Sequence, residues 1–376
     1  MKERNLFITG AAGEGIQTIG DIVARAFLSH GYPVFATSEF ESRIRGGNSS
    51  TRLRIADQPL NAPRPDADIL LALNPRAREH YIGALREGGL LIATEAHAAG
   101  TLAIPFADLA VEHGGDKLYA NAVAAGALGA STGLPFDRLE QVLAAAFAKR
   151  GEEIVAANVA AARAGYDLAA EQLGDKSPEE IPARQASTTF ASAHDAIPLA
   201  AAAAGCRFIS AYPMSPSTGI ITAFARHTDL GVFTEQAEDE IAAINMAIGA
   251  SAAGARAMTA TSGGGFALMT EALSLSAMIE TPIVILIAQR PGPATGLPTR
   301  TAQEDLLFAI RGGHGEFPRL VLAPSDPQDA VDKTVRAFDL ADRFQIPVLL
   351  LTDQYLADST FSLPRLEIPA DAHTPH

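Results

Sequence analysis

The chain has 376 residues, of which 48% are hydrophobic, and a formal net charge of -14. This length favours two or three domains, and the apolar content is enough for sizeable cores. The acidic charge argues against nucleic acid or an anionic membrane as the main partner. No apolar run approaches the about 20 residues that a membrane helix needs, and the first residues lack the apolar region of a secretory signal. We therefore expect a cytoplasmic protein.

The chain contains a single cysteine, Cys206. One thiol cannot form an internal disulfide, and it cannot hold an iron–sulfur cluster, which takes about four cysteines. The sequence therefore predicts no metal site in this chain.

A glycine-rich loop follows the first predicted strand, LFITG at 6–10. It contains Gly10, Gly13 and Gly15, and it leads into a helix whose apolar side carries Ile16, Ile19, Val23 and Phe27. Backbone N–H groups at such a helix start can hold a phosphate. The spacing is GxxGxG, however, and not the dinucleotide fingerprint GxGxxG. A phosphate site and plain close packing of helix on strand both remain open.

Further apolar strands at 33–37, 67–73 and 90–94 alternate with helical stretches, which predicts an α/β domain with a parallel sheet. The segment 38–55, between the first two of these strands, is rich in arginine around a glycine pair. Its members are Arg43, Arg45, Arg52, Arg54, Gly46, Gly47, Asn48 and Ser49. This composition suits an anion site or a partner surface. A solvated hairpin with arginines on its wet face is the other interpretation.

A polar segment with two prolines, 173–190, is typical of a domain linker. We therefore expect a first domain at 1–172 and a second at 191–360, followed by a tail at 361–376. The second domain again alternates apolar strands with helices, which predicts another parallel sheet covered by helices.

Four loops of the second domain follow predicted strands and carry polar groups. They are 212–218, 234–240, 261–265 and 289–305, with hydroxyls, carboxylates, glycines and two arginines, Arg290 and Arg300. Ligands of parallel sheets bind beyond the carboxyl ends of the strands. The four loops together predict a site for a small molecule that bears a carboxylate.

Glu240 opens a helix that is apolar on all sides. Residues 241–255 are apolar or small except for one Asn, and such a helix is expected to be buried. The neighbours of Glu240 on its own face are Ala243, Ile244, Ala247 and Ile248. A carboxylate there is costly unless it is paired, hydrogen-bonded or protonated. Acids in a first turn also complement the helix dipole, which explains Glu238 and Asp239 better than Glu240.

Several motifs together resemble the alpha subunit of 2-oxoacid:ferredoxin oxidoreductases, most closely the 2-oxoglutarate type. In the second domain they are YPMSPST (212–218), EQAEDEIAAINMAIGAS (235–251), TATSGGGFALM (259–269), QRPGPATGLPT (289–299) and LTDQYLADS (351–359). In the first domain GAAGEGIQT (10–18) and SEFESRIRGGNSS (38–50) resemble the family's gamma domain, fused at the amino end. The resemblance covers about 1–360.

The resemblance implies an α/β fold of two parallel-sheet domains, a gamma-type domain and a transketolase-type pyrimidine domain that binds thiamine diphosphate. It also implies the reversible oxidative decarboxylation of 2-oxoglutarate with coenzyme A, which gives succinyl-CoA, CO2 and reduced ferredoxin. Pyruvate or branched-chain 2-oxoacids stay open as substrates.

The same resemblance assigns roles to individual residues. Glu240 matches the glutamate that hydrogen-bonds the aminopyrimidine ring, and Ser215 replaces a threonine that contacts the substrate carboxylate. Arg300 is our first choice for an arginine that binds this carboxylate, and Arg290 is the second. The other residues expected at the cofactor are Tyr212, Pro213, Thr261, Ser262 and Gly263. The loop expected to bind coenzyme A or another phosphate comprises Gly10, Gly13, Gly15, Arg43 and Arg45.

A partner is implied as well, because the chain has neither a GDG…N diphosphate–magnesium motif nor cysteines for a cluster. In the family a beta subunit shares the thiamine diphosphate and carries Mg2+ and a [4Fe–4S] cluster, and ferredoxin is reduced through the complex. We expect an (alpha–beta)2 assembly. Many fused relatives continue beyond the position matching residue 359, so this chain is either a short form or a truncation. A non-catalytic assembly protein and a nucleotide-binding protein using GAAGEG are the alternative functions.

Overall fold

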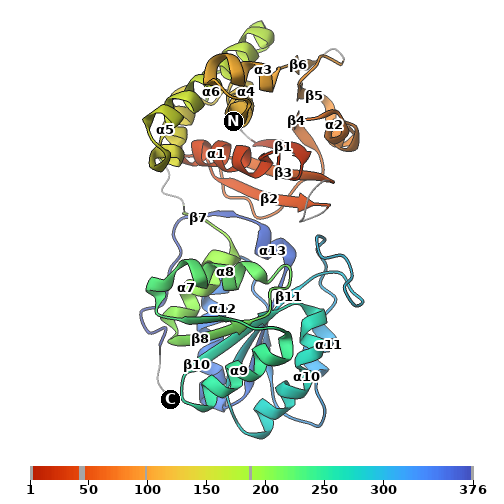
Figure 1. Ribbon diagram of the computed structural model, residues 1–376, viewed down its shortest axis with the longest axis vertical. Helices are drawn as coiled ribbons and strands as arrows, with labels where there is room; N and C mark the ends of the chain where they lie inside the picture. Colours follow the sequence, from red (N-terminus) through yellow and green to blue (C-terminus); the bar gives the residue numbers. More distant parts are fainter. Residues whose placement is uncertain (1–2, 42–46, 98–99, 186–188, 374–376) are drawn as a thin grey trace. The chain divides into compact units, whose positions relative to one another are not determined.

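The structure is a computed structural model that describes residues 3–41, 47–97, 100–185 and 189–373 (Figure 1). The chain divides into two compact units. Unit 1 comprises the residues up to Phe190 together with Phe361–Pro364, and unit 2 comprises Ala191–Thr360 and the residues from Arg365 onward. The boundary lies at the end of the segment predicted as a linker, which belongs to unit 1. The predicted tail is shared between the units, because its first residues return to unit 1.

Unit 1 contains a six-stranded sheet with the order β2-β3-β1-β4-β5-β6. Its strands are β1 (Glu3–Ala11), β2 (Val34–Phe40), β3 (Asn48–Ala56), β4 (Ala67–Ala72), β5 (Leu85–Ala93) and β6 (Thr101–Ala103). β1, β4, β5 and β6 are parallel, whereas β3 is antiparallel to both of its neighbours. The predicted parallel sheet is thus present in β1, β4, β5 and β6, and the antiparallel β3 makes the sheet as a whole mixed. Too few residues separate β2 from β3 for a parallel crossover, which takes about a dozen, so the two strands form a hairpin.

The helices of unit 1 are α1 (Ile16–Ser29), α2 (Pro75–Tyr81), α3 (Phe106–Leu109), α4 (Ala120–Thr132), α5 (Phe136–Phe147) and α6 (Glu152–Leu173). The predicted apolar side of α1 is confirmed, because Ile16, Ile19, Val23 and Phe27 are all buried. They join the main core of this unit, where helix residues pack against the apolar side chains of β1, β3 and β4. The short strands β7 (Thr189–Ala191) and β14 (Phe361–Leu363) form a separate two-stranded sheet.

Unit 2 contains a six-stranded sheet with the order β12-β13-β11-β10-β8-β9, and all neighbouring strands are parallel. Its strands are β8 (Cys206–Ala211), β9 (Phe233–Gln236), β10 (Arg256–Thr261), β11 (Ile283–Gln289), β12 (Leu320–Leu322) and β13 (Pro347–Asp353). Its helices are α7 (Ala193–Ala203), α8 (Thr218–Arg226), α9 (Glu240–Ala252), α10 (Gly263–Met278), α11 (Leu306–Arg311), α12 (Pro327–Phe344) and α13 (Gln354–Asp358). The predicted helix-covered parallel sheet is confirmed in this unit.

The order of the strands places a topological switch between β8 and β10. From β8 the chain moves outward to the edge strand β9, and it then returns to the other side of β8 as β10. Helices cover both faces: α9 and α10 pack together on one of them, and α7 and α12 pack together on the other (Figure 1). A crevice for ligands forms at such a switch, outside the carboxyl ends of the strands. In the described parts of both units, no helix combines the length and the apolar character needed to cross a membrane.

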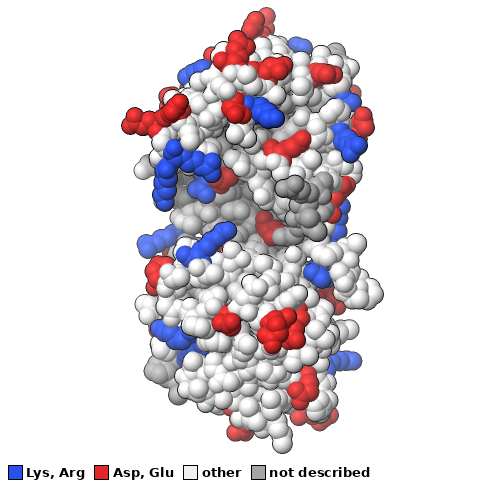
Figure 2. Space-filling view, in the orientation of Figure 1, with Lys and Arg blue, Asp and Glu red and all other residues white. Residues whose placement is uncertain are grey.

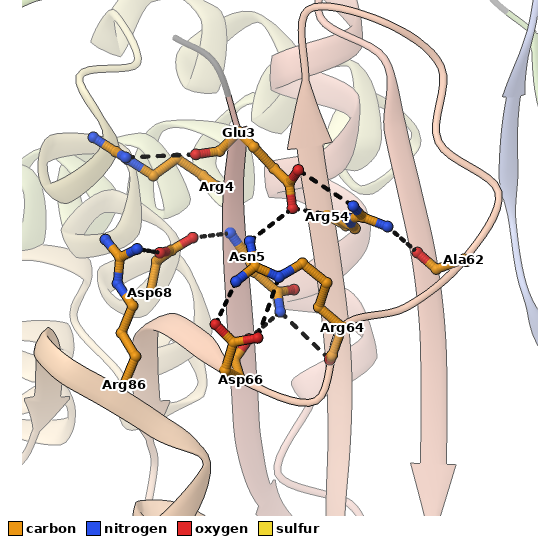
Figure 3. A network of polar contacts seen from close by, with 9 residues as sticks. All are labelled: Glu3, Arg4, Asn5, Arg54, Ala62, Arg64, Asp66, Asp68 and Arg86. Atoms are coloured by element: carbon orange, nitrogen blue, oxygen red, sulfur yellow. Dashed lines mark hydrogen bonds and ion pairs between the residues drawn. The ribbon is translucent and has the colours of Figure 1, made fainter.

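A polar network surrounds the first residues of β1 in unit 1 (Figure 3). The carboxylate of Glu3 accepts from Arg54 Nε at 2.9 Å and from Arg64 Nη1 at 3.0 Å. The buried carboxylate of Asp68 accepts from the backbone N–H of Asn5 at 2.6 Å and pairs with Arg86 at 2.7 Å. These groups tie the loop after β3 to β1. Every carboxylate of the network has a cationic partner. The network therefore stabilises the fold.

Glu3→Gln is expected to lower the free energy of unfolding by about 1 kcal/mol at neutral pH. Hydrogen bonds from Arg54, followed by those from Arg64, lower the pKa of Glu3 despite its partial burial. The contribution is therefore full above the unfolded carboxyl pKa of about 4.3 and is lost as the pH falls through the lower folded value. Urea unfolding of the chain at about pH 7 and about pH 3 measures this. Exposed Glu87→Gln is the control, and equal losses at both pH values would contradict the prediction.

Candidate active site

Glu240 is the first residue of α9, and it is buried. Asp239 caps the helix by accepting the backbone N–H of Ala242 at 2.7 Å. Glu240 is only 4% exposed, and within the described chain its Oε1 has no hydrogen-bond partner. Burial raises the pKa of this carboxyl, while its own backbone N–H and the charge of Arg290 oppose the shift. The dipole interpretation thus fits Asp239, whereas Glu240 is a buried acid whose neutral form is favoured.

The carboxyl of Glu240 packs against the first turn of α10, which begins where β10 ends. A Cβ at Gly265 would lie 2.6 Å from Glu240 Oε1 and 2.1 Å from Thr261 Oγ1, so only glycine fits there. Ser262, the N-cap residue of α10, is fully buried, and its Oγ has no partner among the residues described. Two buried oxygens without partners therefore lie at one helix turn. A ligand with hydrogen-bonding groups would satisfy them.

Arg290 joins the loops that follow β8 and β11. Its Nη1 donates to the carbonyl of Ser215 at 2.7 Å. Burial lowers the pKa of the guanidinium, and the nearby charge of Glu240 opposes this shift. The structure therefore brings Arg290, our second choice from sequence, to Ser215 and Glu240. Arg300 lies in an exposed part of the same loop, where its backbone N–H donates to the carbonyl of Leu297 at 3.0 Å.

The remaining residues expected at the cofactor also follow strands β8 and β10. Tyr212 and Pro213 come directly after β8, and the side chain of Tyr212 is 39% exposed. Thr261 ends β10 and is fully buried, and Gly263 begins α10. Since β8 and β10 are adjacent, these residues lie around the switch point that holds Glu240.

Two residues of this site, Gln289 and Asp305, received no role from the sequence. Gln289 ends β11, is 4% exposed and accepts the backbone N–H of Asp305 at 2.9 Å. A Cβ at Gly263 would lie 2.4 Å from either carboxyl oxygen of Asp305, so this carboxyl contacts the start of α10. One sequence feature could have pointed to Asp305: it is an acid immediately before the apolar pair Leu306 and Leu307, where a helix begins.

The glycine loop of unit 1 is closely packed at Gly10 and Gly15 but open at Gly13. Gly13 and Gly15 have positive φ values of 97° and 76°, and a Cβ at Gly15 would lie 2.0 Å from Asn121 Nδ2. Glu14 Oε2 accepts the backbone N–H of Ala11 at 2.7 Å and the side-chain amide of Asn74 at 2.6 Å. A carboxylate thus occupies one donor near Gly10 that a phosphate would use. Arg43 and Arg45 lie outside the described residues.

The site in unit 2 combines a carboxyl whose pKa is raised by burial with a partly buried guanidinium. Such a carboxyl can form a hydrogen bond with a ring nitrogen of a ligand. The carboxyl and the nitrogen then share one proton in a site that excludes water. The guanidinium suits an anionic group such as a carboxylate. These groups fit the aminopyrimidine of thiamine diphosphate next to a small acid. No group of three or more His, Cys, Asp or Glu residues in the described ranges is placed to hold a metal ion.

Two protein families match the two units. Residues 199–373 match the family described as pyruvate flavodoxin/ferredoxin oxidoreductase, thiamine diphosphate-binding, and residues 5–168 match the family described as pyruvate ferredoxin/flavodoxin oxidoreductase. The fold, the buried acid and these matches define the class, an oxidoreductase subunit with a thiamine diphosphate-binding domain.

Proteins of similar sequence show the family to which this chain belongs. The alpha subunit of 2-oxoacid:ferredoxin oxidoreductase 2 from Aeropyrum pernix is 31% identical over 98% of this chain and 68% of its own length. The 2-oxoglutarate oxidoreductase subunit KorA of Mycobacterium tuberculosis is 31% identical over 93% of this chain and 60% of its own length. The chain belongs to the family of 2-oxoacid:ferredoxin oxidoreductase alpha subunits, which use ferredoxin as electron acceptor. It spans about two thirds of the length of such relatives, for example 66% of the Sulfolobus subunit.

A solved structure supports the same assignment. It is the 2-oxoglutarate:ferredoxin oxidoreductase from Magnetococcus marinus with 2-oxoglutarate, coenzyme A and succinyl-CoA bound. The match has a TM-score of 0.91 and 35% identity, and it covers 100% of this chain and 67% of that one. The suspected family is therefore confirmed.

Glu240→Gln is expected to stabilise the chain at about pH 8 by about 0.5–2 kcal/mol, as removal of a costly site residue often does. The raised pKa of Glu240 means that the folded chain binds the proton more tightly than the unfolded chain. Wild-type stability consequently falls as the pH rises from about 4.3 through the folded value, whereas Gln has no charge to bury. Urea unfolding at about pH 4 and about pH 8 compares the two, with exposed Glu238→Gln as the control. A destabilised variant at the higher pH would contradict this account.

Proposed function

We propose that this chain is the alpha subunit, with a fused gamma domain, of a coenzyme A-acylating 2-oxoacid:ferredoxin oxidoreductase that acts on 2-oxoglutarate. The reaction converts 2-oxoglutarate and coenzyme A to succinyl-CoA and CO2, and two electrons leave singly for ferredoxin. The observation that carries the proposal is the buried carboxyl of Glu240 beside Arg290 at the switch point. Support for the substrate comes from the 2-oxoglutarate enzymes among the relatives.

Glu240 is proposed to hold the aminopyrimidine ring of thiamine diphosphate. Bound thiamine diphosphate supplies the electron sink that decarboxylation of a 2-oxoacid requires. In its protonated form, Glu240 donates a hydrogen bond to a ring nitrogen, and its raised pKa favours that form. Its unpartnered Oε1 and the unpartnered Oγ of Ser262 are the atoms that a polar ring would satisfy. Tyr212, Pro213, Thr261 and Gly263 line the same switch point.

Arg290 and Ser215 are proposed to bind the carboxylate next to the keto group. The guanidinium is already oriented by the Ser215 carbonyl, so little side-chain freedom is lost when an anion binds. A carboxylate held there would lie on the same side of the sheet as Glu240, whose charge interacts with Arg290. Arg300 remains a candidate for a second contact from the same loop.

A beta subunit is proposed to cover the exposed apolar face of α9, α10 and α11. The exposed large apolar residues of this face are Ile241, Met246, Leu268, Leu275, Met278, Leu306, Leu307 and Ile310. Figure 2 shows few charged side chains over α9 and α10. Exposed apolar patches of this kind mark protein interfaces. The beta subunit would supply Mg2+ and a [4Fe–4S] cluster, share the thiamine diphosphate and pass electrons to ferredoxin in an (alpha–beta)2 complex in the cytoplasm.

Coenzyme A is proposed to bind at the carboxyl edge of the unit 1 sheet, near Gly10, Gly13 and Gly15. The Magnetococcus marinus enzyme, which covers this whole chain, has coenzyme A bound. Glu14 accepts one backbone N–H of the loop. The phosphates of coenzyme A would therefore rely on other donors, such as Arg43 and Arg45.

Glu240→Gln in the purified alpha–beta complex is expected to lower 2-oxoglutarate-dependent viologen reduction by about 100- to 10,000-fold, the usual cost of losing an acid or base. Glu238→Gln, two residues away and exposed, should retain activity. Turnover is measured with coenzyme A and a panel of 2-oxoacids. Near-wild-type turnover in Glu240→Gln with thiamine diphosphate bound would refute the proposed role, and a wild-type complex without thiamine-dependent activity would favour an assembly protein.

Arg290→Ala should raise the KM for every 2-oxoacid by about 10- to 100-fold, because a charge-assisted hydrogen bond contributes about 1.5–3 kcal/mol. Ser215→Ala should have a smaller effect, about threefold to tenfold, since its hydroxyl is neutral. Arg300→Ala is the matched comparison in the same loop. Initial rates at varied substrate concentration decide between the arginines, and a large effect only at Arg300 would restore the choice made from sequence.

Leu268→Asp is expected to abolish co-purification with the beta subunit, because it places a charge in the centre of the apolar face. Leu268 is 52% exposed, so the chain itself should keep its melting temperature. Ile368→Asp, at a residue that is 41% exposed outside this face, is the control. Affinity purification followed by a gel measures binding. The chain without its partner should be colourless and inactive, and a brown, active single chain would contradict the proposed complex.

A further inference from the structure

Asp305 stands at the N-cap position of α11, but its side chain makes no hydrogen bond to that helix. Both of its carboxyl oxygens lie 2.4 Å from the position of a Cβ on Gly263. Its Oδ2 is buried, and no hydrogen-bond partner for it occurs in the described ranges. Its backbone N–H is fixed by the side chain of Gln289, which is buried at the end of β11. The carboxyl is thus held over the first residue of α10.

The same turn of α10 contacts the carboxyl of Glu240 two residues further on, at Gly265. Gly265 contacts the Glu240 carboxyl as Gly263 contacts Asp305, and a Cβ at either glycine would collide with the carboxyl beside it. The N-cap residue of α10, Ser262, makes no side-chain hydrogen bond to this turn. Both carboxyls therefore pack closely against this turn, one on each side of Gly264 in the sequence. A shift of the turn at Gly263 would move Gly265 away from Glu240.

We propose that Asp305 is a positioning residue for Glu240: it connects β11 to the first turn of α10 and keeps Gly265 packed against the Glu240 carboxyl. The importance of this contact for turnover rests on the proposed function of Glu240. The contact itself does not, because it is a property of the chain alone.

The shape of Asp305 matters here more than its charge. Burial raises the pKa of this carboxyl, and the charge of its neighbour Glu304 raises it further. The elements packed against it present the backbone of Gly263 and the amide of Gln289, neither of which is charged. A neutral side chain of the same size therefore fits the position. Asp305→Asn should preserve the contact, whereas Asp305→Ala leaves a gap over Gly263.

The test is the pKa of Glu240 in the full chain, measured from carboxyl 13C chemical shifts during a pH titration. The signal is assigned by its loss in Glu240→Gln. In the wild type and in Asp305→Asn, the pKa should lie above the ordinary value of about 4.3. In Asp305→Ala it should fall toward that value, because the loosened turn admits water. Glu304→Gln, at the residue that directly precedes Asp305, is the matched control. If Asp305→Ala does not fold, the smaller change Asp305→Ser replaces it.

An unchanged Glu240 pKa in Asp305→Ala, or an equal fall in Asp305→Asn and Asp305→Ala, would overturn the inference. In the assembled complex, Asp305→Ala should lower kcat/KM for 2-oxoglutarate by up to about 100-fold, the effect of a displacement of about 1 Å at a reacting group. Asp305→Asn should restore most of this loss. An inactive wild-type complex would refute the proposed function, whereas the titration of the chain would still decide the role of Asp305.

Discussion

The burial of one carboxyl, that of Glu240, is the constraint on which the rest of the site depends. An acid in an apolar environment is tolerated only if it is protonated, paired or bound. Here the helix cap is supplied by Asp239, so Glu240 is left free to face the start of α10. Gly265 has no side chain because the carboxyl takes its space. Arg290 supplies a partial counter-charge and is itself partly desolvated.

The acids around β1 in unit 1 and the acids of the candidate site in unit 2 have opposite environments. In unit 1 the acids near β1 have arginine partners, and the pKa of Glu3 is lowered as a result. In unit 2 the pKa values of Glu240 and Asp305 are raised, and each has a buried oxygen without a partner in the described structure. Paired charges stabilise a fold, whereas unpaired buried acids destabilise it and are retained where chemistry needs them.

The exposed apolar faces of α9 and α10 connect the candidate site to the proposed subunit interface. Helices α9 and α10 are rich in apolar residues, yet each exposes some of them, such as Ile241 and Leu268. Both helices begin at the switch point, with Glu240 and Gly263. A partner that covers their exposed face would also exclude water from the carboxyl at their amino ends, which raises its pKa further. Binding of such a partner would thereby be physically linked to the burial of Glu240.

The all-apolar pattern of residues 241–255 predicts a buried helix, whereas Ile241 and Met246 of α9 are exposed. Local periodicity in the sequence was sufficient for the two α/β units and for the buried side of α1, and it singled out Glu240 as an acid that begins an apolar helix. Each depends on residues within a few turns or strands of one another. Two features depended on tertiary structure: the placement of Arg290 rather than Arg300 beside Ser215, and the contact of Asp305 with Gly263. The direction of a side chain within a long loop depends on strands that are distant in sequence. The sequence alone therefore singled out Glu240, Ser215 and the two arginines. The folded structure decided that Arg290 lies beside Ser215 and that Asp305 contacts the start of α10.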